Sequence, residues 1–325
     1  MRGLVIRGSR NIFTVRPEPG GSGDSPAGDL ECRIKGKILK GAESRYNPLA
    51  PGDWVRVEPD PAKPGAGMVT GLEERRNIFT RMNQKGLDTN RSATSQILAA
   101  NVDLVFCVTS AASPPFRPRF LDRILIQADA AGIEALILCN KYDLAGKPGE
   151  LDPDLEERLE DFRRIGYRVL RISAKTGEGM GKLGELAGGR VSLFLGQSGV
   201  GKSSIINALL PAPLARVGTL NEKYDRGNHT TTMSWMIALP PVEGGYLIDS
   251  PGIRRFLPDG IGPGELILHM REFAPLAGTC TYGLSCTHRS EPGCKVLEAV
   301  HAGVIHEDRY ESFIRIREEL MGDRR

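Results

Sequence analysis

A glycine-rich octapeptide in the second half of the chain carries the clearest chemistry. It reads Gly196-Gln197-Ser198-Gly199-Val200-Gly201-Lys202-Ser203, after the apolar run Val191–Leu195 and before a predicted helix, Ser204–Leu210. Backbone N–H groups of such a loop bind phosphate, its lysine neutralises the β- and γ-phosphates, and its serine ligates Mg²⁺. A glycine-rich turn with an incidental lysine is the alternative, but strand, loop and helix agree. The sequence therefore predicts a nucleotide site from Gly196 to Ser204.

Two short motifs before this loop indicate which base is bound. Asn140-Lys141-Tyr142-Asp143 follows the apolar run Ala135–Leu138, and Ser173-Ala174-Lys175 follows the run Arg168–Ile172. The Asp143 carboxylate can accept hydrogen bonds from guanine N1–H and the 2-amino group, and adenine has neither donor. In the second motif a backbone N–H would meet guanine O6. Each motif alone also fits an ordinary turn, but all three sites at strand ends together predict guanine binding.

A third set of polar residues is expected to hold Mg²⁺ and to respond to the γ-phosphate. Asp249-Ser250-Pro251-Gly252 follows the run Tyr246–Ile248 and matches D-x-x-G, in which Asp249 would hold the ion through water and the Gly252 N–H would contact phosphate. His229-Thr230-Thr231-Thr232 lies where a switch threonine should supply another ligand. Spacing alone does not choose among the three threonines.

The residue after D-x-x-G cannot orient the attacking water. Many GTPases have a glutamine there, whereas this chain has Ile253, which has no hydrogen-bonding atoms. His229 is the best candidate for that task, because imidazole can accept a proton near neutral pH. The alternative is that His229 packs the loop or contacts RNA. Ile253 also predicts slow intrinsic hydrolysis that awaits a partner.

The order of the motifs along the chain is unusual. An ordinary GTPase runs from the phosphate loop through the switch threonine and D-x-x-G to N-K-x-D and S-A-K, whereas here the last two come first. The sequence thus predicts a circular permutation in which the second switch leads directly into the C-terminal region. Movement after hydrolysis would then reach that region without an intervening sheet.

Four residues of the C-terminal region have the types and spacing of a metal site. Cys280, Cys286, His288 and Cys294 offer three thiolates and one imidazole, which is a tetrahedral Zn²⁺ set. Because no coordination position stays open, one structural ion is expected, on which a segment with little core would depend for folding.

A basic face is predicted in the N-terminal region. Arg33, Lys35 and Lys37 alternate along one strand, Lys40 follows, and Arg76 and Arg81 lie further on. Small β-barrels of the OB type bind nucleic acid through such faces, by phosphate attraction and base stacking. An ordinary solvated charged face is the alternative.

Three regions of the chain, each with its own predicted fold, would position these residues. Residues 1–92 contain several short strand-like runs broken by Gly and Pro and no long helical period, which predicts a small β-barrel. Residues 93–263 alternate strands with helices, which predicts an α/β P-loop domain whose parallel sheet is covered on both faces. Residues 264–325 contain the Cys/His cluster and then amphipathic helix. The expected fold class is therefore multidomain.

Composition is consistent with these expectations. The 325 residues include 43 Lys+Arg and 40 Asp+Glu, so RNA binding must come from local patches. No apolar run approaches a membrane span, and the N-terminus does not resemble a secretory signal. Six cysteines are too few for a disulfide scaffold, which favours a reducing cytoplasm.

The motifs together resemble the ribosome small-subunit-dependent GTPase family of the RsgA (YjeQ) type, along essentially the whole chain. The resemblance rests on Asn140–Asp143, Gly196–Ser203, Gly227–Thr232, Asp249–Arg254 and Cys280–Cys294. It implies an OB-fold, a permuted GTPase domain and a zinc domain, with Thr231 as the switch threonine and His229 in the catalytic step. The chain departs from the family at Asn228, where an arginine is usual.

The resemblance also implies a cycle and a partner. GTP and Mg²⁺ would hold the switches, contact with the maturing small (30S) ribosomal subunit and its rRNA would accelerate hydrolysis, and GDP would weaken binding. We expect a cytoplasmic monomer whose catalytic residues are Lys202, Thr231 and His229. A non-catalytic RNA-binding scaffold locked by nucleotide is the alternative, which Ile253 favours and the intact magnesium set opposes. An ATP-using P-loop kinase conflicts with Asp143.

Overall fold

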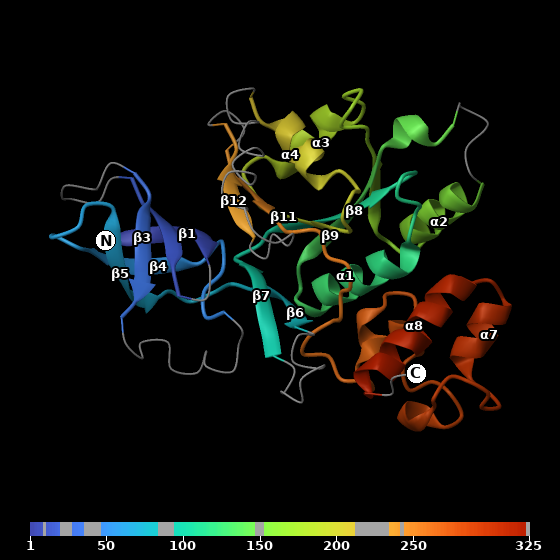
Figure 1. The fold of residues 1–325 in the computed structure, drawn as a ribbon. Coiled ribbons are helices and arrows are strands. Elements are labelled where there is room, and N and C mark those ends of the chain that lie inside the picture. The colour runs from blue at the N-terminus through green and yellow to red at the C-terminus, as the bar shows by residue number, and fades with distance from the viewer. Residues whose placement is uncertain are drawn as a thin grey trace.

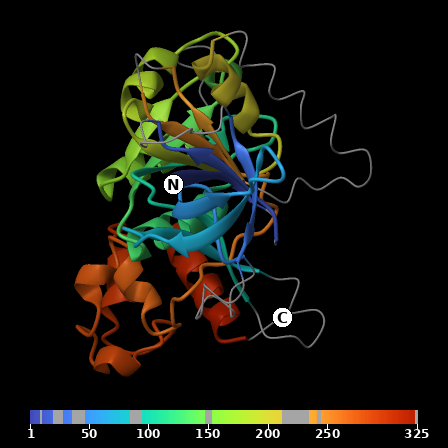
Figure 2. The same cartoon turned by 90° about the vertical axis from the view of Figure 1, so that its left-hand side faces the viewer.

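The computed structural model describes residues 1–8, 11–19, 28–35, 47–83, 94–146, 153–211, 234–240 and 244–322. Figure 1 shows a strand-rich N-terminal body, a central sheet with helices on both faces, and a helical C-terminal body. In the turned view of Figure 2 the strand-rich body faces the viewer and the C-terminal body lies below it. No helix among the described residues is long and apolar enough to cross a membrane.

Five short strands form the N-terminal barrel. They are β1 (Arg2–Gly8), β2 (Phe13–Pro17), β3 (Leu30–Ile34), β4 (Trp54–Pro59) and β5 (Ala66–Leu72). The strands pair in the order β1-β2-β3-β5-β4, and β1 also pairs with β4, so the ladder closes on itself. Alternate side chains, among them Val5, Val15 and Val57, pack inside the barrel and are almost fully buried. The small barrel predicted from the short strand-like runs is therefore confirmed.

A separate antiparallel hairpin, β6 (Ile78–Asn83) and β7 (Thr94–Ala100), lies between the barrel and the central sheet (Figure 1). The sequence patterns predict neither strand, because a bulge between Phe79 and Thr80 shifts the register and breaks the alternation. The Met82 N–H donates to the carbonyl of Leu257 at 3.1 Å, so the hairpin is bound to the segment that follows D-x-x-G. The predicted border between residues 92 and 93 falls between these strands, outside the described residues.

The central sheet consists mainly of parallel strands. β8 (Leu104–Ser110), β9 (Glu134–Asn140), β10 (Arg168–Arg171), β11 (Val191–Gly196) and β13 (Tyr246–Asp249) run parallel, and β12 (Trp235–Ala238) is antiparallel to β13. The apolar runs predict the parallel strands, β8 from Val102–Val108 and the others from the runs named above, but not β12, whose four consecutive apolar residues show no alternation. β12 also pairs with β1 of the barrel, at Trp235 and Arg7, so the two bodies share one ladder of eleven strands.

Helices cover both faces of the parallel strands. α1 (Pro118–Ala130) and α2 (Pro153–Arg164) lie on one face, and α3 (Met180–Ala187) and α4 (Lys202–Leu209) on the other. On β8, Val105 packs in the cluster with α1, whereas its neighbour Phe106 packs in the cluster with α3 and α4. Strands buried on both faces are continuous apolar runs, which is why the sequence predicted them well. Gly132 follows the end of α1 and has the left-handed conformation that commonly terminates a helix (φ 65°).

The C-terminal body contains short turns and two helices. They are η4 (Leu266–His269), η5 (Ala274–Leu276), η6 (Gly283–Ser285), α7 (Lys295–His301) and α8 (Glu307–Leu320). This body packs against α1 through Ile126, which belongs to the C-terminal hydrophobic cluster. Arg309 of α8 is 1% exposed and forms ion pairs with Asp122 of α1 at 2.6 Å and with Glu272 at 2.5 Å. The predicted order of barrel, α/β sheet and helical Cys/His body is confirmed.

Candidate functional site

The predicted phosphate loop connects β11 to α4 in one tight turn. Gly199 and Gly201 have φ values of 84° and 94°, which favour glycine over other residues. A Cβ on Gly201 would lie 2.3 Å from Asn140 Nδ2, so this glycine also lets the base motif approach. Lys202 Nζ lies inside the turn and donates to the carbonyls of Gly196 (2.9 Å) and Gln197 (3.0 Å). Burial lowers the pKa of Lys202.

Asn140 connects the three predicted nucleotide loops. Its Nδ2 donates to the carbonyl of Val200 at 2.9 Å, and its Oδ1 accepts from the Ala174 N–H at 3.1 Å. Lys141 Nζ donates to the carbonyl of Gly199 at 2.8 Å. Segments that are far apart in the sequence are therefore held at one edge of the sheet by side-chain hydrogen bonds.

The predicted base-reading carboxylate is held by a buried serine. Asp143 lies in the 3₁₀ turn η2 (Tyr142–Leu144), and its Oδ1 accepts a hydrogen bond from Ser173 Oγ at 2.7 Å. Ser173 is fully buried and also accepts the Thr176 N–H at 3.1 Å. This arrangement fixes the direction of the carboxylate. Lys175 is exposed at the rim of the same edge.

The predicted magnesium residues lie at the opposite, phosphate end of the site. Asp249 ends β13, and its Oδ1 is buried without a hydrogen-bond partner among the described residues. Desolvation raises the pKa of Asp249 to about 6, while Lys202 and a hydrogen bond from Ser203 act against this rise. A buried carboxylate oxygen without a partner, beside a serine hydroxyl, is a donor pair that fits Mg²⁺. Ser203 and Ser204 are exposed at the start of α4.

The segment after Asp249 lies against the phosphate loop. A Cβ on Gly252 would be 2.9 Å from Cα of Ser198, so only glycine allows this approach. The Ile253 N–H donates to the Gly196 carbonyl at 3.3 Å, whereas its side chain is buried in the core with Phe256. The side chain of Ile253 therefore packs in the protein interior and has no part in orienting water.

Several predicted site residues lie outside the described residues. They are His229 and Thr231 of the first switch, with Asn228 and the rest of Gly227–Thr232, and Lys37 and Lys40 of the basic face. Their predicted roles stay predictions.

The remaining basic residues of the predicted RNA face lie in two places. Arg33 is exposed on β3, and Lys35, also exposed, directly follows this strand and forms an ion pair with Glu58 at 3.1 Å. Arg76 forms an ion pair with Asp103 at 2.9 Å, and Arg81 donates to Gln96 at 3.0 Å, so both make contacts within the connection between barrel and central sheet.

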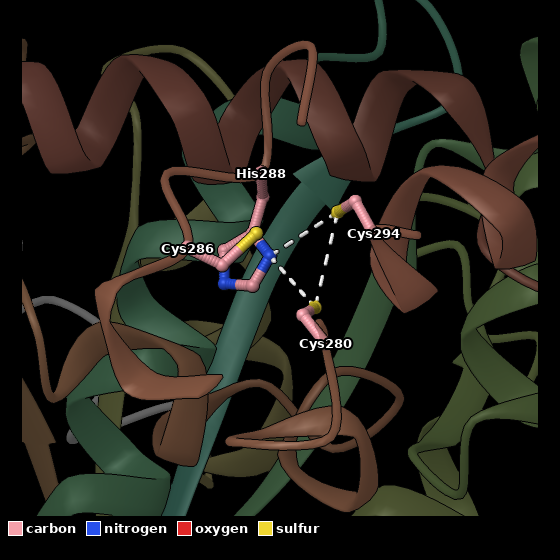
Figure 3. Close-up of side chains that lie close together, drawn as sticks. All are labelled: Cys280, Cys286, His288 and Cys294. Carbon is pink, nitrogen blue, oxygen red and sulfur yellow. Dashed lines mark hydrogen bonds between the residues drawn. The ribbon is translucent and has the colours of Figure 1, made fainter. Parts of the chain in front are cut away.

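The predicted zinc ligands converge in the C-terminal body (Figure 3). Cys280, Cys286, His288 and Cys294 are all buried, and their ligand atoms lie within 4.8 Å of one another. His288 Nδ1 is 3.6 Å from Cys280 Sγ and 3.4 Å from Cys294 Sγ. Burial raises the pKa of Cys286 to about 12 and lowers that of His288. Three sulfurs and one imidazole around a common centre are the donor set that Zn²⁺ takes in closed structural sites.

Two supporting residues of the zinc loop were not predicted as such. Glu291 accepts the hydroxyl and backbone N–H of Thr287 and the N–H of Arg289, and these hydrogen bonds lower the pKa of its carboxyl. The Tyr310 hydroxyl donates to the His288 carbonyl at 2.8 Å and fixes the loop against α8. The signal for Glu291 in the sequence is its place within Cys280–Cys294, one of the segments on which the family resemblance rests.

Comparisons with known proteins agree with this geometry. The family model described as RsgA GTPase matches residues 72–257. A curated Bacteroides fragilis protein named "Small ribosomal subunit biogenesis GTPase RsgA" is 37% identical over 98% of this chain and 97% of its own length. A Chlorobaculum parvum protein of the same name is 37% identical over 98% of both chains.

Two solved structures have the same fold. YjeQ from Thermotoga maritima superposes with a TM-score of 0.68 at 29% identity, covering 99% of both chains. YloQ, described as a circularly permuted GTPase, gives a TM-score of 0.66 at 23% identity over 100% of this chain and 96% of its own. At that identity the second likeness concerns the fold alone.

Proposed function

This chain belongs to the RsgA GTPase family, and we propose that it hydrolyses GTP on the maturing small ribosomal subunit, in whose biogenesis it acts. The observation that carries this proposal is the position of Asn140, which holds the phosphate loop and the Ser173–Lys175 loop together beside Asp143. Such an edge suits a guanine nucleotide. The relatives named above at 37% identity carry the biogenesis function in their names.

Each predicted residue has a task in the proposed reaction. Asp143 would accept the guanine N1–H and 2-amino donors, and a backbone N–H of the Ser173–Lys175 loop would donate to O6. The loop from Gly196 to Ser204 would bind the phosphates. Lys202 would leave the carbonyls of Gly196 and Gln197 and donate to the β- and γ-phosphate oxygens. Mg²⁺, when bound, supplies charge that stabilises the transferring phosphoryl group. Ser203, Asp249 and Thr231 are the residues that would hold it.

The attacking water needs a residue other than Ile253. That side chain is buried in the core, which supports the proposal that His229 orients the water and accepts its proton. The Gly252 N–H, close to the phosphate loop, would contact the γ-phosphate. Intrinsic turnover would be slow, and contact with the subunit would complete the site.

The proposed function also assigns a partner or a role to each of the three regions of the chain. We propose that residues 1–92 bind rRNA through Arg33, Lys35, Lys37 and Lys40 with Arg76 and Arg81, and that residues 93–263 and 264–325 form the GTPase and zinc domains. One Zn²⁺ would hold the C-terminal loop. The protein would act as a cytoplasmic monomer.

GTP turnover by the purified protein tests this proposal. Turnover is measured alone, with small subunits, with large subunits and with naked RNA. Strong stimulation by small subunits only is the expected result. Tight GTP binding with unchanged turnover would instead indicate a nucleotide-locked scaffold, and a preference for ATP over GTP would overturn the base assignment.

A further inference from the structure

A cleft lined by several arginines adjoins the nucleotide site described above and shares one residue of the phosphate loop with it. Its volume is about 500 Å³, and it lies between the start of α1, the segment after D-x-x-G and the start of α8. Five arginines line it: Arg117, Arg119, Arg123, Arg254 and Arg255. Gln197 of the phosphate loop forms part of the same wall, and Asp308 is the acidic residue of the lining.

Three of these arginines are compensated by carboxylates of α8. Arg123 donates to both carboxylate oxygens of Glu319, at 2.8 and 2.9 Å. Arg119 contacts Glu311 and lies 3.5 Å from Asp308. Arg255 lies 3.5 Å from Glu319, which it shares with Arg123. These pairs hold the back of the cleft against the C-terminal body.

The other two arginines have no such partner. Arg117 and Arg254 are exposed, and neither guanidinium has a hydrogen bond or ion pair with any of the residues that the structure describes. The lining of the cleft thus includes two uncompensated cations from separate segments, one at the start of α1 and one two residues after Gly252. Phe116, which is half-buried, adds an aromatic surface next to Arg117.

We propose that this cleft binds the sugar–phosphate backbone of single-stranded RNA, with Arg117 and Arg254 contacting phosphates and Phe116 offering a face for a base. Guanidinium groups bind phosphate through paired N–H donors, and bases stack on aromatic rings without sequence preference. Here the two free cations are exposed, which suits an extended polyanion.

The cleft lies next to the second switch, so RNA bound in it would be close to the nucleotide site. Arg254 belongs to the segment that leaves the second switch, so RNA in the cleft and nucleotide in the site contact one continuous stretch of backbone. The proposal rests on the proposed function in one respect: the small subunit is the expected source of the RNA. The cleft lies apart from the barrel face, so it would be a second RNA contact.

Salt-dependent RNA affinity tests the site without using ribosomal subunits. Binding of a short fluorescein-labelled single-stranded RNA to the full chain is measured by anisotropy over a range of KCl concentrations. Each phosphate contact on a single strand contributes about 0.7 to the slope of log affinity against log salt, so Arg117→Gln and Arg254→Gln should each lower the slope by about that amount. Arg117→Lys keeps the charge and should keep the slope.

Matched variants separate this cleft from other surfaces. Arg168→Gln removes an exposed arginine outside the cleft, which lies on β10 and pairs with Glu134 at 3.0 Å, and should leave the slope unchanged. Arg33→Gln reports what the barrel contributes. Because Arg117 and Arg254 have no partners to lose, their variants should melt at the parent temperature.

Each outcome decides the proposal. An unchanged slope and affinity in the Arg117→Gln/Arg254→Gln double variant would overturn it, as would a parent protein that does not bind the RNA. A photo-crosslinker placed at Pro118 should react with rRNA on small subunits, and reaction with an acidic protein segment instead would also overturn it. Failure of the proposed function would appear separately, as parent turnover that subunits do not stimulate.

Discussion

The two candidate metal sites of this protein are built in opposite ways. At the zinc site, four buried donors from one short loop already converge within 4.8 Å, and no position remains for another ligand. At the magnesium site, Asp249 presents a buried oxygen without a partner beside an exposed serine, and other donors must come from nucleotide and from the first switch. The difference indicates that one ion supports the fold and the other supports the reaction.

Losing a zinc ligand should have the largest effect. Cys286→Ser should release the metal and unfold the C-terminal loop, because coupled metal binding in such sites is worth about 10 kcal/mol or more. Hydrogen exchange would show lost protection in residues 264–322 and unchanged protection in the barrel. Cys107→Ala, which removes a buried thiol of β8, is the control and should keep one zinc per chain. Full protection in a zinc-free Cys286→Ser protein would refute a structural role for the metal.

The second largest effect should come from the ion pairs that join the C-terminal body to α1. Arg309→Leu would leave Asp122 and Glu272 buried without their cation, which costs about 3–5 kcal/mol in unfolding free energy. Chemical denaturation measures this cost, and Arg315→Leu, on the exposed side of α8, should cost far less.

A second variant keeps that prediction open to refutation. Adding Asp122→Asn and Glu272→Gln to Arg309→Leu removes the unpaired charges and should restore part of the stability. If the triple variant were less stable than Arg309→Leu, packing of the arginine stem rather than charge would explain the loss. Either result would show how much of the stability of the C-terminal body comes from its contact with α1, in addition to the stability that zinc supplies.

At the candidate magnesium site, removing a ligand should stabilise the fold, whereas removing a zinc ligand should destabilise it. Asp249→Asn should stabilise the nucleotide-free protein by about 1–3 kcal/mol at neutral pH, since one pKa unit is worth about 1.4 kcal/mol and burial raises this pKa to about 6. The same variant should lose Mg²⁺-dependent GTP turnover. Denaturation and turnover measured on one sample test both expectations, and a destabilised variant would contradict the first.

The sign of the pH dependence follows from the same group. The folded pKa of Asp249 lies above its ordinary value of 3.8, so between about pH 4 and 6 the folded state binds more protons than the unfolded state. This carboxyl therefore makes the parent less stable as the pH rises through that range. Asp249→Asn should lack this contribution, and the difference between the two denaturation curves isolates it.

The sequence predicted the residues of the nucleotide and zinc sites better than the strands and long-range contacts that hold the three bodies together. The phosphate loop, the Asn140–Asp143 motif and the Cys/His cluster are local in sequence, so their residue types and spacing are enough to identify them. β12 and the hairpin β6–β7 were missed, because a bulge and a four-residue strand leave no period to detect. The ion pairs of Arg309, and the shared cleft that brings Arg117 and Arg254 together, depend on residues far apart in the sequence, so no local pattern encodes them.

The smallest predicted effect concerns the base end of the nucleotide site. Like the zinc site, and unlike the magnesium site, this end already has its polar groups in place without a ligand. Ser173 donates to Asp143 at 2.7 Å, so Ser173→Ala should let the carboxylate turn and weaken GDP binding by about 1–2 kcal/mol. Inosine diphosphate lacks the 2-amino donor, so its binding should suffer less. Ser250→Ala removes a similarly buried hydroxyl, bonded to the Phe194 carbonyl at 2.7 Å, and should weaken both nucleotides equally. Equal losses for both nucleotides in Ser173→Ala would mean that the serine supports the fold of the loop and does not position the base-reading carboxylate.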